Sequence, residues 1–370
     1  MAARPGQTHD KNVVILAEKD GLDKLDAPLA PSESAFLRQG AERDISSFFF
    51  PRADGGIFIR LLKPDKNPAF AAEDARLAGN ELLSDLRKYK IETVTLRNFC
   101  TDNQSLAFAE GMVLGNYQFL KYFSDADKKE NPLREIFIEG IAETDVAEMN
   151  ALLDSVFLTR DLVNEPHSNL NALQLTTAIE AAGREYGFQV EVLGKEKLES
   201  IKMGGLLAVN RASTVPPQFC ILEWKPANAR NEKPIVLVGK GVVYDTGGLS
   251  LKPTEGMDYM KCDMAGAATV VGAMAVAARK KKSPPPPRAG PAHPNTNSAR
   301  RCDTYVFRQN RRGAQHRCRG PHHLGRCVAL CEKIRPGIGT RFCHPHRFGG
   351  AGARRTSDML HGHSAAGSQN

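Results

Sequence analysis

The sequence predicts an α/β protein with a smaller N-terminal α/β domain (residues 1–150), an incomplete C-terminal α/β domain with a mostly parallel sheet (residues 151–279), and a disordered tail (residues 280–370). Short apolar runs alternate with segments of helical spacing, which is typical of parallel sheets covered by helices. One run, residues 234–239, is apolar throughout, as in a strand that is buried on both faces. The composition then changes abruptly at Lys280.

The N-terminal domain is expected to alternate strands with helices. Apolar runs that suit strands occur at residues 12–16, 56–62, 93–96 and 135–139. Helical spacing covers residues 68–88 and 104–123. The apolar and aromatic side chains of the second of these helices are interpreted as core residues, because they follow one helical face.

The C-terminal domain begins with a long helix, expected over residues 144–163. Asn164-Glu165-Pro166 ends this helix, because the residue before a proline avoids the helical conformation. A second helix is expected at residues 171–186, followed by strands at residues 189–193, 219–224 and 234–239. Ligands bind at the carboxyl ends of strands in such sheets, so the candidate site lies from Lys240 onward.

The tail differs from the rest of the chain in charge. Residues 280–370 hold 18 Lys and Arg against 3 Asp and Glu, whereas the first 279 residues hold 32 against 39. Only 11 of these 91 tail residues are Val, Ile, Leu, Met or Phe, and low apolar content with high net charge predicts disorder. The net charge of +8 therefore describes no single domain, and we expect no specific nucleic-acid partner.

Cysteine use and hydropathy indicate the compartment. The first 279 residues contain only Cys100, Cys220 and Cys262, which argues against a disulfide framework and fits a reducing cytosol. The N-terminus has no basic segment followed by an apolar run, and no stretch approaches 18 consecutive apolar residues. We therefore expect a cytoplasmic protein without a membrane partner.

Among the charged residues that follow the apolar run at 234–239, four are candidates for chemistry: Lys240, Asp245, Lys252 and Asp263. The two carboxylates could supply hard oxygen ligands to divalent metals. A nearby cation would lower the pKa of Lys240, so that its neutral amine could act as a ligand, while a charged Lys252 could polarise a carbonyl. On spacing alone, a surface loop with compensating Lys–Asp pairs remains the alternative.

Residues 238–274 read VGKGVVYDTGGLSLKPTEGMDYMKCDMAGAATVVGAM. This segment resembles the signature of the leucyl (cytosol) aminopeptidase family of two-metal exopeptidases, V-G-K-G-x-x-x-D-T-G-G-L-S-L-K-P…M-x-x-M-K-x-D-M-x-G-A-A. Weaker similarity extends to residues 160–166 and 203–209. The N-terminal region, with residues 110–115, looks like the smaller non-catalytic domain of that family.

The resemblance implies a metal-dependent aminopeptidase that uses two divalent ions, Mn²⁺ or Zn²⁺, to release leucine-like N-terminal residues from peptides. By motif position, Lys240, Asp245 and Asp263 match metal ligands, and Asp245 would serve both ions. Lys252 matches a catalytic residue that acts electrostatically, and Met260 matches a wall of the pocket for the first side chain of the substrate. The family forms hexamers, an assembly that the incomplete catalytic domain calls into question.

The resemblance stops where the family carries Asn-Thr-Asp-Ala-Glu-Gly-Arg, whose Asp and Glu complete the metal site and whose Arg holds a bicarbonate-like base. That string is absent here. Codons that encode QHRCRGP, residues 315–321, nevertheless read Asn-Thr-Asp-Ala-Glu-Gly-Arg after the loss of one nucleotide. The same shift permits family-like residues throughout 307–328 and at 341–347. We hypothesise that the tail is an out-of-frame reading that begins between residues 277 and 307, and that the chain as written is inactive.

Other interpretations of the tail are weaker. Cys327, Cys331 and Cys343 with nearby histidines match no standard zinc spacing. Arginine pairs such as Arg300-Arg301 would bind nucleic acid without specificity, as any strongly basic tail does. The alternative functions are a non-enzymatic binding protein and a fragment without a cellular role.

Overall fold

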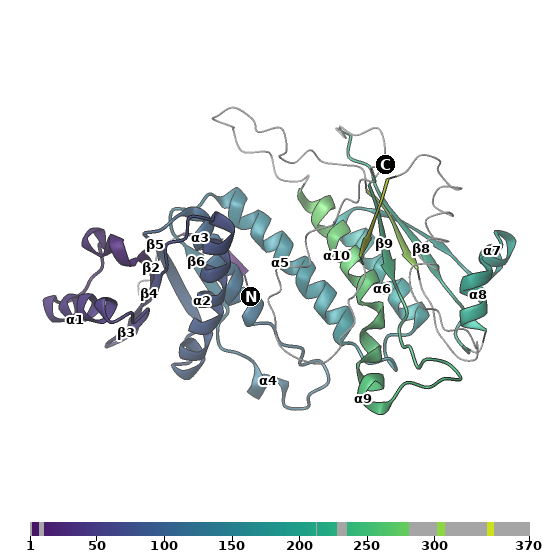
Figure 1. Cartoon of the computed structure of the whole chain (residues 1–370), viewed down its shortest axis with the longest axis horizontal. Coiled ribbons are helices and arrows are strands. Elements are labelled where there is room, and N and C mark those ends of the chain that lie inside the picture. The colour runs from purple at the N-terminus through teal and green to yellow at the C-terminus, as the bar shows by residue number, and fades with distance from the viewer. Residues whose placement is uncertain are drawn as a thin grey trace, which may run out of the picture.

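The computed structural model describes residues 2–6, 11–211, 213–227 and 235–280, together with the backbone of 302–307 and 339–343. Two α/β lobes lie on either side of one long helix, α5 (Glu143–Asn164) (Figure 1). Each lobe contains one sheet with helices packed against it, which confirms the predicted α/β class.

Six strands form the sheet of the first lobe, in the order β1-β6-β5-β2-β4-β3. Neighbouring strands are parallel except β3, which is antiparallel to β4. The strands are β1 (Ala2–Pro5), β2 (Asn12–Glu18), β3 (Ser47–Arg52), β4 (Gly55–Leu62), β5 (Thr93–Asn98) and β6 (Glu135–Ile138).

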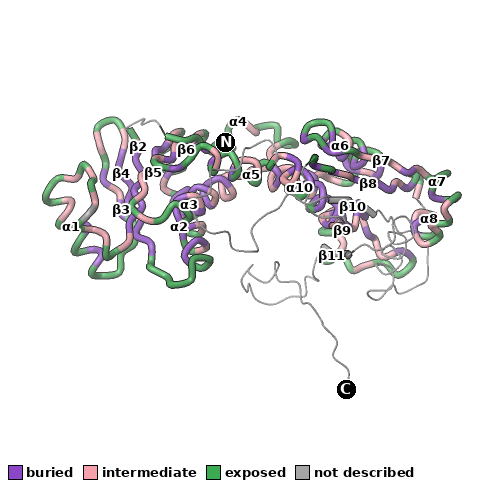
Figure 2. Tube along the Cα trace, turned by 90° about the horizontal axis from the view of Figure 1, so that it is seen from above, coloured by how far each residue is buried: buried purple, intermediate pink, exposed green. Residues whose placement is uncertain are grey.

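Both faces of this sheet are covered. Because successive side chains of a strand point to opposite faces, Val14 and Leu16 of β2 join the core that includes residues of α2 and α3, whereas Val13 and Ile15 join the core that includes residues of α1. The two faces therefore contribute to separate cores, and buried residues run along the strands of this lobe (Figure 2). The helical segments of the lobe are η1 (Lys19–Lys24), α1 (Pro31–Glu42), α2 (Pro68–Lys88), α3 (Asp102–Gly115) and α4 (Ala126–Lys129).

The four strands predicted for this lobe are confirmed, and α2 has the predicted bounds. Helix α3 is shorter than predicted: it ends at Gly115, although helical spacing continues to residue 123. The residue after Gly115 forms a hydrogen bond outside the helix, because the Asn116 side chain donates to the Leu133 carbonyl oxygen, just before β6, at 3.0 Å. Five elements of this lobe are absent from the sequence-based prediction: β1, η1, α1, β3 and α4.

Helix α5 connects the two lobes and belongs to both cores. Val146, Met149 and Leu153 of its first half pack in the first lobe, whereas Leu162 near its end packs in the second. The boundary predicted between residues 150 and 151 therefore falls inside one continuous helix.

The sheet of the second lobe has the order β11-β9-β10-β8-β7. Strand β9 is parallel to both of its neighbours, whereas β8 is antiparallel to both of its own. The strands are β7 (Gln189–Leu193), β8 (Phe219–Trp224), β9 (Ile235–Lys240), β10 (Cys302–Phe307) and β11 (Gly339–Cys343). The last two lie within the predicted disordered tail; the rest of that prediction concerns residues outside the described ranges.

Helices also cover both faces of this second sheet. Cys220 and Leu222 of β8 pack in a core formed with α5, α6 and α10, whereas Phe219 packs with α7 and α8. These helices, together with the short segments before α10, are α6 (Ala172–Tyr186), α7 (Lys195–Ser200), α8 (Gly204–Asn210), α9 (Thr254–Met257), η2 (Asp258–Met264) and α10 (Ala265–Arg279).

One stretch of the described residues, Thr254–Arg279, is long and apolar enough to cross a membrane by length and composition, although the sequence-based expectation is that none is. Its most apolar window is 50% buried inside the protein. Helix α10, which makes up most of this stretch, packs against β9 and α5. Burial in the second lobe therefore explains its apolar character, as in the core helix of a soluble protein.

Candidate metal and catalytic site

The candidate site begins where the buried strand β9 ends, at Lys240. Gly239 allows the start of α10 to lie directly on this strand end. A Cβ atom at residue 239 would lie 2.5 Å from the Gly266 carbonyl oxygen and 2.7 Å from the Ala267 Cα atom, closer than packed atoms can approach. This contact brings Asp263, just before α10, beside Lys240.

Lys240 and Asp263 form the first charged pair of the site. The Lys240 ammonium group contacts both carboxylate oxygens of Asp263. The Asp263 side chain is only 13% exposed. Burial raises the pKa of Asp263 above its ordinary value, and the negative charge of Asp245 adds to this, although Lys240 acts in the opposite direction.

Asp245 and Lys252 form the second pair. The Lys252 Nζ atom lies 3.1 Å from Asp245 Oδ2, and the Gly247 N–H donates to Asp245 Oδ1 at 2.9 Å. Burial alone would raise the pKa of Asp245, but the hydrogen bond from Gly247 and the charge of Lys252 outweigh it and lower that pKa. Gly247 has φ +87°, and a Cβ atom there would lie 2.5 Å from the Ser250 carbonyl oxygen, so this turn requires glycine.

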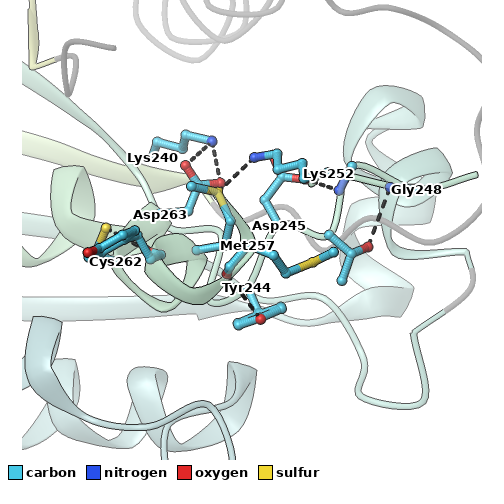
Figure 3. Close-up of polar contacts among 12 residues, drawn as sticks. Lys240, Tyr244, Asp245, Gly248, Lys252, Met257, Cys262 and Asp263 are labelled. Atoms are coloured by element: carbon cyan, nitrogen blue, oxygen red, sulfur yellow. Dashed lines mark hydrogen bonds and ion pairs between the residues drawn. The ribbon is translucent and has the colours of Figure 1, made fainter. Parts of the chain in front are cut away.

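The five residues predicted from the sequence lie together. Lys252 Nζ is 2.7 Å from the Met260 sulfur, a contact that joins the loop after β9 to the η2 segment. Figure 3 shows the side chains of Lys240, Asp245, Lys252 and Asp263 close together. Both pairs join a lysine to an aspartate, as the alternative of a surface loop also expects. However, both carboxylates are largely buried, and their charges interact with each other. The arrangement is a small charged cluster at a strand end rather than a set of separate surface pairs.

The donor set fits part of a two-metal site. Two carboxylates and a lysine amine converge, and each carboxylate contacts a positive group. Among residues 2–6, 11–211, 213–227 and 235–280, no group of three or more His, Cys, Asp or Glu side chains is close enough to hold a metal ion. The donors present could therefore contribute to metal binding but do not complete a site for two ions.

Tyr244 and Lys261 also hold the site, and the sequence-based reasoning missed both. The Tyr244 hydroxyl donates to the Met257 carbonyl oxygen at 3.1 Å, and its ring lies 5.4 Å from the His167 ring. Lys261 donates to the Asn164 carbonyl oxygen at 2.8 Å. Tyr244 lies next to Asp245, and Lys261 matches the lysine in the M-K-x-D part of the signature, which is the signal that could have pointed to it.

The fold and the charged cluster define an α/β protein with a candidate metallohydrolase site at the end of a buried strand. Residues 157–285 match the family model described as the cytosol aminopeptidase family, catalytic domain. The similarity to the cytosol aminopeptidase family that the signature predicts is therefore confirmed for residues 157–285.

Similar proteins cover much of the chain. A probable cytosol aminopeptidase of Chlorobium limicola is 39% identical over 260 residues, which are 60% of this chain and 51% of that protein. A probable cytosol aminopeptidase of Phytoplasma australiense is 35% identical over 296 residues, which are 73% of this chain and 57% of that protein. The chain thus spans about half the length of the curated relatives it matches.

Solved structures have the same fold. The bottromycin maturation enzyme BotP in complex with Mn is 25% identical, with a TM-score of 0.62 over 82% of this chain and 60% of that chain. A tomato leucine aminopeptidase variant is 20% identical, with a TM-score of 0.64 over 86% of this chain and 64% of that chain; this likeness concerns the fold.

Proposed function

We propose that this chain derives from a metal-dependent aminopeptidase that releases leucine-like N-terminal residues from peptides in the cytoplasm, and that the chain as written is inactive. One observation supports the first part most strongly. Lys240, Asp245, Lys252 and Asp263 converge at the end of β9, within the segment that matches the family's catalytic domain. The names of the relatives agree with this reaction and this compartment.

The residues of the cluster would have separate roles in the reaction. Lys240, Asp245 and Asp263 would hold divalent ions, Mn²⁺ or Zn²⁺, which would supply Lewis-acid activation of the peptide carbonyl and of water. Lys252, whose ammonium group lies between Asp245 and Met260, would stabilise negative charge that develops on the carbonyl oxygen. Met260 would contact the first side chain of the peptide.

The proposed inactivity follows from the missing donors. The described residues offer two carboxylates, whereas a pair of divalent ions needs more oxygen ligands to bind tightly. Loss of outer-shell partners alone lowers metal affinity or activity by about 10–100-fold, so loss of the ligands themselves should have at least this effect. The out-of-frame reading of residues 307–328 would account for the loss, because the shifted string contains the missing Asp, Glu and Arg.

The nucleotide sequence tests the frame hypothesis directly. A single-base change between codons 277 and 307 should restore Asn-Thr-Asp-Ala-Glu-Gly-Arg in place of residues 315–321. We call the product of such a gene the frame-restored protein. If no single-base change in this interval restores the string, the frame hypothesis is wrong.

Hydrolysis of leucine amide with added Mn²⁺ or Zn²⁺ tests the function. The frame-restored protein should release leucine, whereas the chain as written should show negligible release. Asp263→Asn in the frame-restored protein is the matched control, because it removes one charge of the cluster and should abolish activity; persistence of activity would indicate a contaminating peptidase. Turnover by the chain as written at the rate of the frame-restored protein would contradict the proposed inactivity.

A further inference from the structure

The C-terminal end of α5 and the segment that follows it contact residues next to both ion pairs of the charged cluster. The backbone carbonyl oxygen of Asn164, the last residue of α5, accepts a hydrogen bond from Lys261 Nζ at 2.8 Å. Three residues further on, the His167 ring packs at 5.4 Å from the Tyr244 ring, next to Asp245. Lys261 in turn lies two residues before Asp263 in η2. The segment after α5 therefore supports the loop after β9 and the η2 segment together.

The same helix end is also attached to the first lobe. The Asn164 side chain donates to the Tyr117 hydroxyl oxygen at 3.1 Å, and this hydroxyl donates to Asp161 at 2.7 Å. Lys121 forms an ion pair with Glu165. Asn164 thus joins the first lobe through its side chain and the η2 segment through its backbone.

Three physical reasons make the Lys261 contact important. The last carbonyl groups of a helix have no partner within the helix, and a cation there is favoured by the helix dipole. A charged donor also makes a stronger hydrogen bond than a neutral one. The η2 segment is a seven-residue 3-10 helix, a conformation with weak internal hydrogen bonds, so external contacts contribute much to its position.

We propose that Lys261 is a positioning residue that holds the η2 segment, with Met260 and Asp263, against the C-terminal end of α5. Lys261 contacts neither substrate nor metal in this role; it sets the place of Asp263 relative to Lys240. As a statement about an active site the inference rests on the proposed function, but the contact itself can be tested without metal and without hydrolysis.

Alkylation of Cys262 in the full-length chain reports the position of η2. Cys262 lies between Lys261 and Asp263, is half-buried, and donates its thiol hydrogen to the Tyr259 carbonyl oxygen at 2.7 Å. Iodoacetamide at one fixed pH, with peptide-level mass spectrometry, gives its rate separately from those of the other thiols. Lys261→Met should accelerate alkylation of Cys262 about tenfold, equivalent to about 1.4 kcal/mol. Acceleration would reflect greater exposure of the Cys262 thiol after movement of the η2 segment.

Internal references separate local from global effects. Cys100 and Cys220 should keep their wild-type rates in Lys261→Met, because the change is confined to η2. Lys261→Arg should restore protection of Cys262, since arginine keeps both the charge and the donor. Arg279→Met removes another ion pair to α5, with Asp154 at 2.7 Å, and should leave Cys262 at the wild-type rate.

The outcomes are distinct. Acceleration at Cys262 alone, with rescue by arginine, supports the positioning role even if the frame-restored protein cleaves no peptide. Wild-type reactivity of Cys262 in Lys261→Met, equal acceleration at Cys100, Cys220 and Cys262, or failure of arginine to restore protection would each overturn the proposal. None of these readings depends on whether the proposed function holds.

Discussion

Replacing Gly239 by alanine should destabilise the second lobe, because the start of α10 lies directly against the end of β9. The added Cβ atom would lie 2.5 Å from the Gly266 carbonyl oxygen and 2.7 Å from the Ala267 Cα atom. Both are backbone atoms, so neither can rotate away as a flexible side chain could. Overpacking of a core costs about 1–3 kcal/mol, and obstruction by backbone places Gly239→Ala toward the upper end, at about 2–3 kcal/mol.

Tryptophan fluorescence gives an assay that is local to this lobe. The chain contains one tryptophan, and Trp224 is 7% exposed in the core that also contains Ala267 and Ala268. Urea unfolding followed at Trp224 therefore reports the second lobe separately from the first, which matters because a protein with two lobes need not unfold in one step. For a slope of about 2 kcal/mol per molar urea, the midpoint should fall by about 1 M or more.

Gly204→Ala is the matched control. A Cβ atom at residue 204 would have no neighbour within 4 Å, and this glycine lies in α8, where alanine favours the helix by up to about 1 kcal/mol. Its unfolding midpoint should equal or exceed that of the wild type. A Gly239→Ala protein with the same midpoint as Gly204→Ala would refute the close packing of α10 on β9.

Three further predictions concern the first lobe. Burial raises the pKa of Cys100 to about 12, so iodoacetamide at pH 8 should leave it almost unlabelled in the folded protein; labelling as fast as that of a free thiol would contradict this. Thr101→Ala removes a capping box shared with Gln104 at the start of α3 and should lower the free energy of unfolding by about 1 kcal/mol, measured by urea titration; an unchanged value would argue against the cap. Arg52 donates to both carboxylate oxygens of Glu33 and lowers its pKa below 4.5, so the stability difference between the wild type and Glu33→Gln should be complete above pH 4.5 and disappear as pH falls through the lowered pKa. Thermal unfolding against pH measures that difference, and a constant difference down to pH 2 would count against the pair.

Local sequence patterns were sufficient to predict helices and strands in which buried residues recur at regular intervals. The spacing of apolar residues over Pro68–Lys88 predicted α2 because one face of that helix is buried. Strand β1 has no such signal, since Ala3 is its only buried residue. It is held by pairing with β6 and by the Asn150 side chain, which donates to the Ala3 carbonyl oxygen at 2.7 Å. Contacts so distant in the sequence leave no local trace.

Part of the candidate site could likewise be predicted from the sequence, and part could not. Lys240, Asp245, Lys252, Met260 and Asp263 could be selected because their spacing matches a family signature. The resemblance places Asp263 on the Lys240 side of the site, but spacing alone does not give the direct contacts between lysines and carboxylates, because these depend on how the start of α10 packs on the end of β9. Neither could the support from the end of α5, which joins residues 97 positions apart in the sequence.

The most direct test of the central claim is a Mn²⁺ titration of the frame-restored protein, followed by electron paramagnetic resonance of the free ion. Two Mn²⁺ ions should bind per chain, the chain as written should bind them far more weakly, and Asp245→Asn in the frame-restored protein should abolish tight binding. A frame-restored protein that is folded but leaves Mn²⁺ free, or that binds it equally well without the Asp245 carboxylate, would contradict the assignment of this cluster as a metal site.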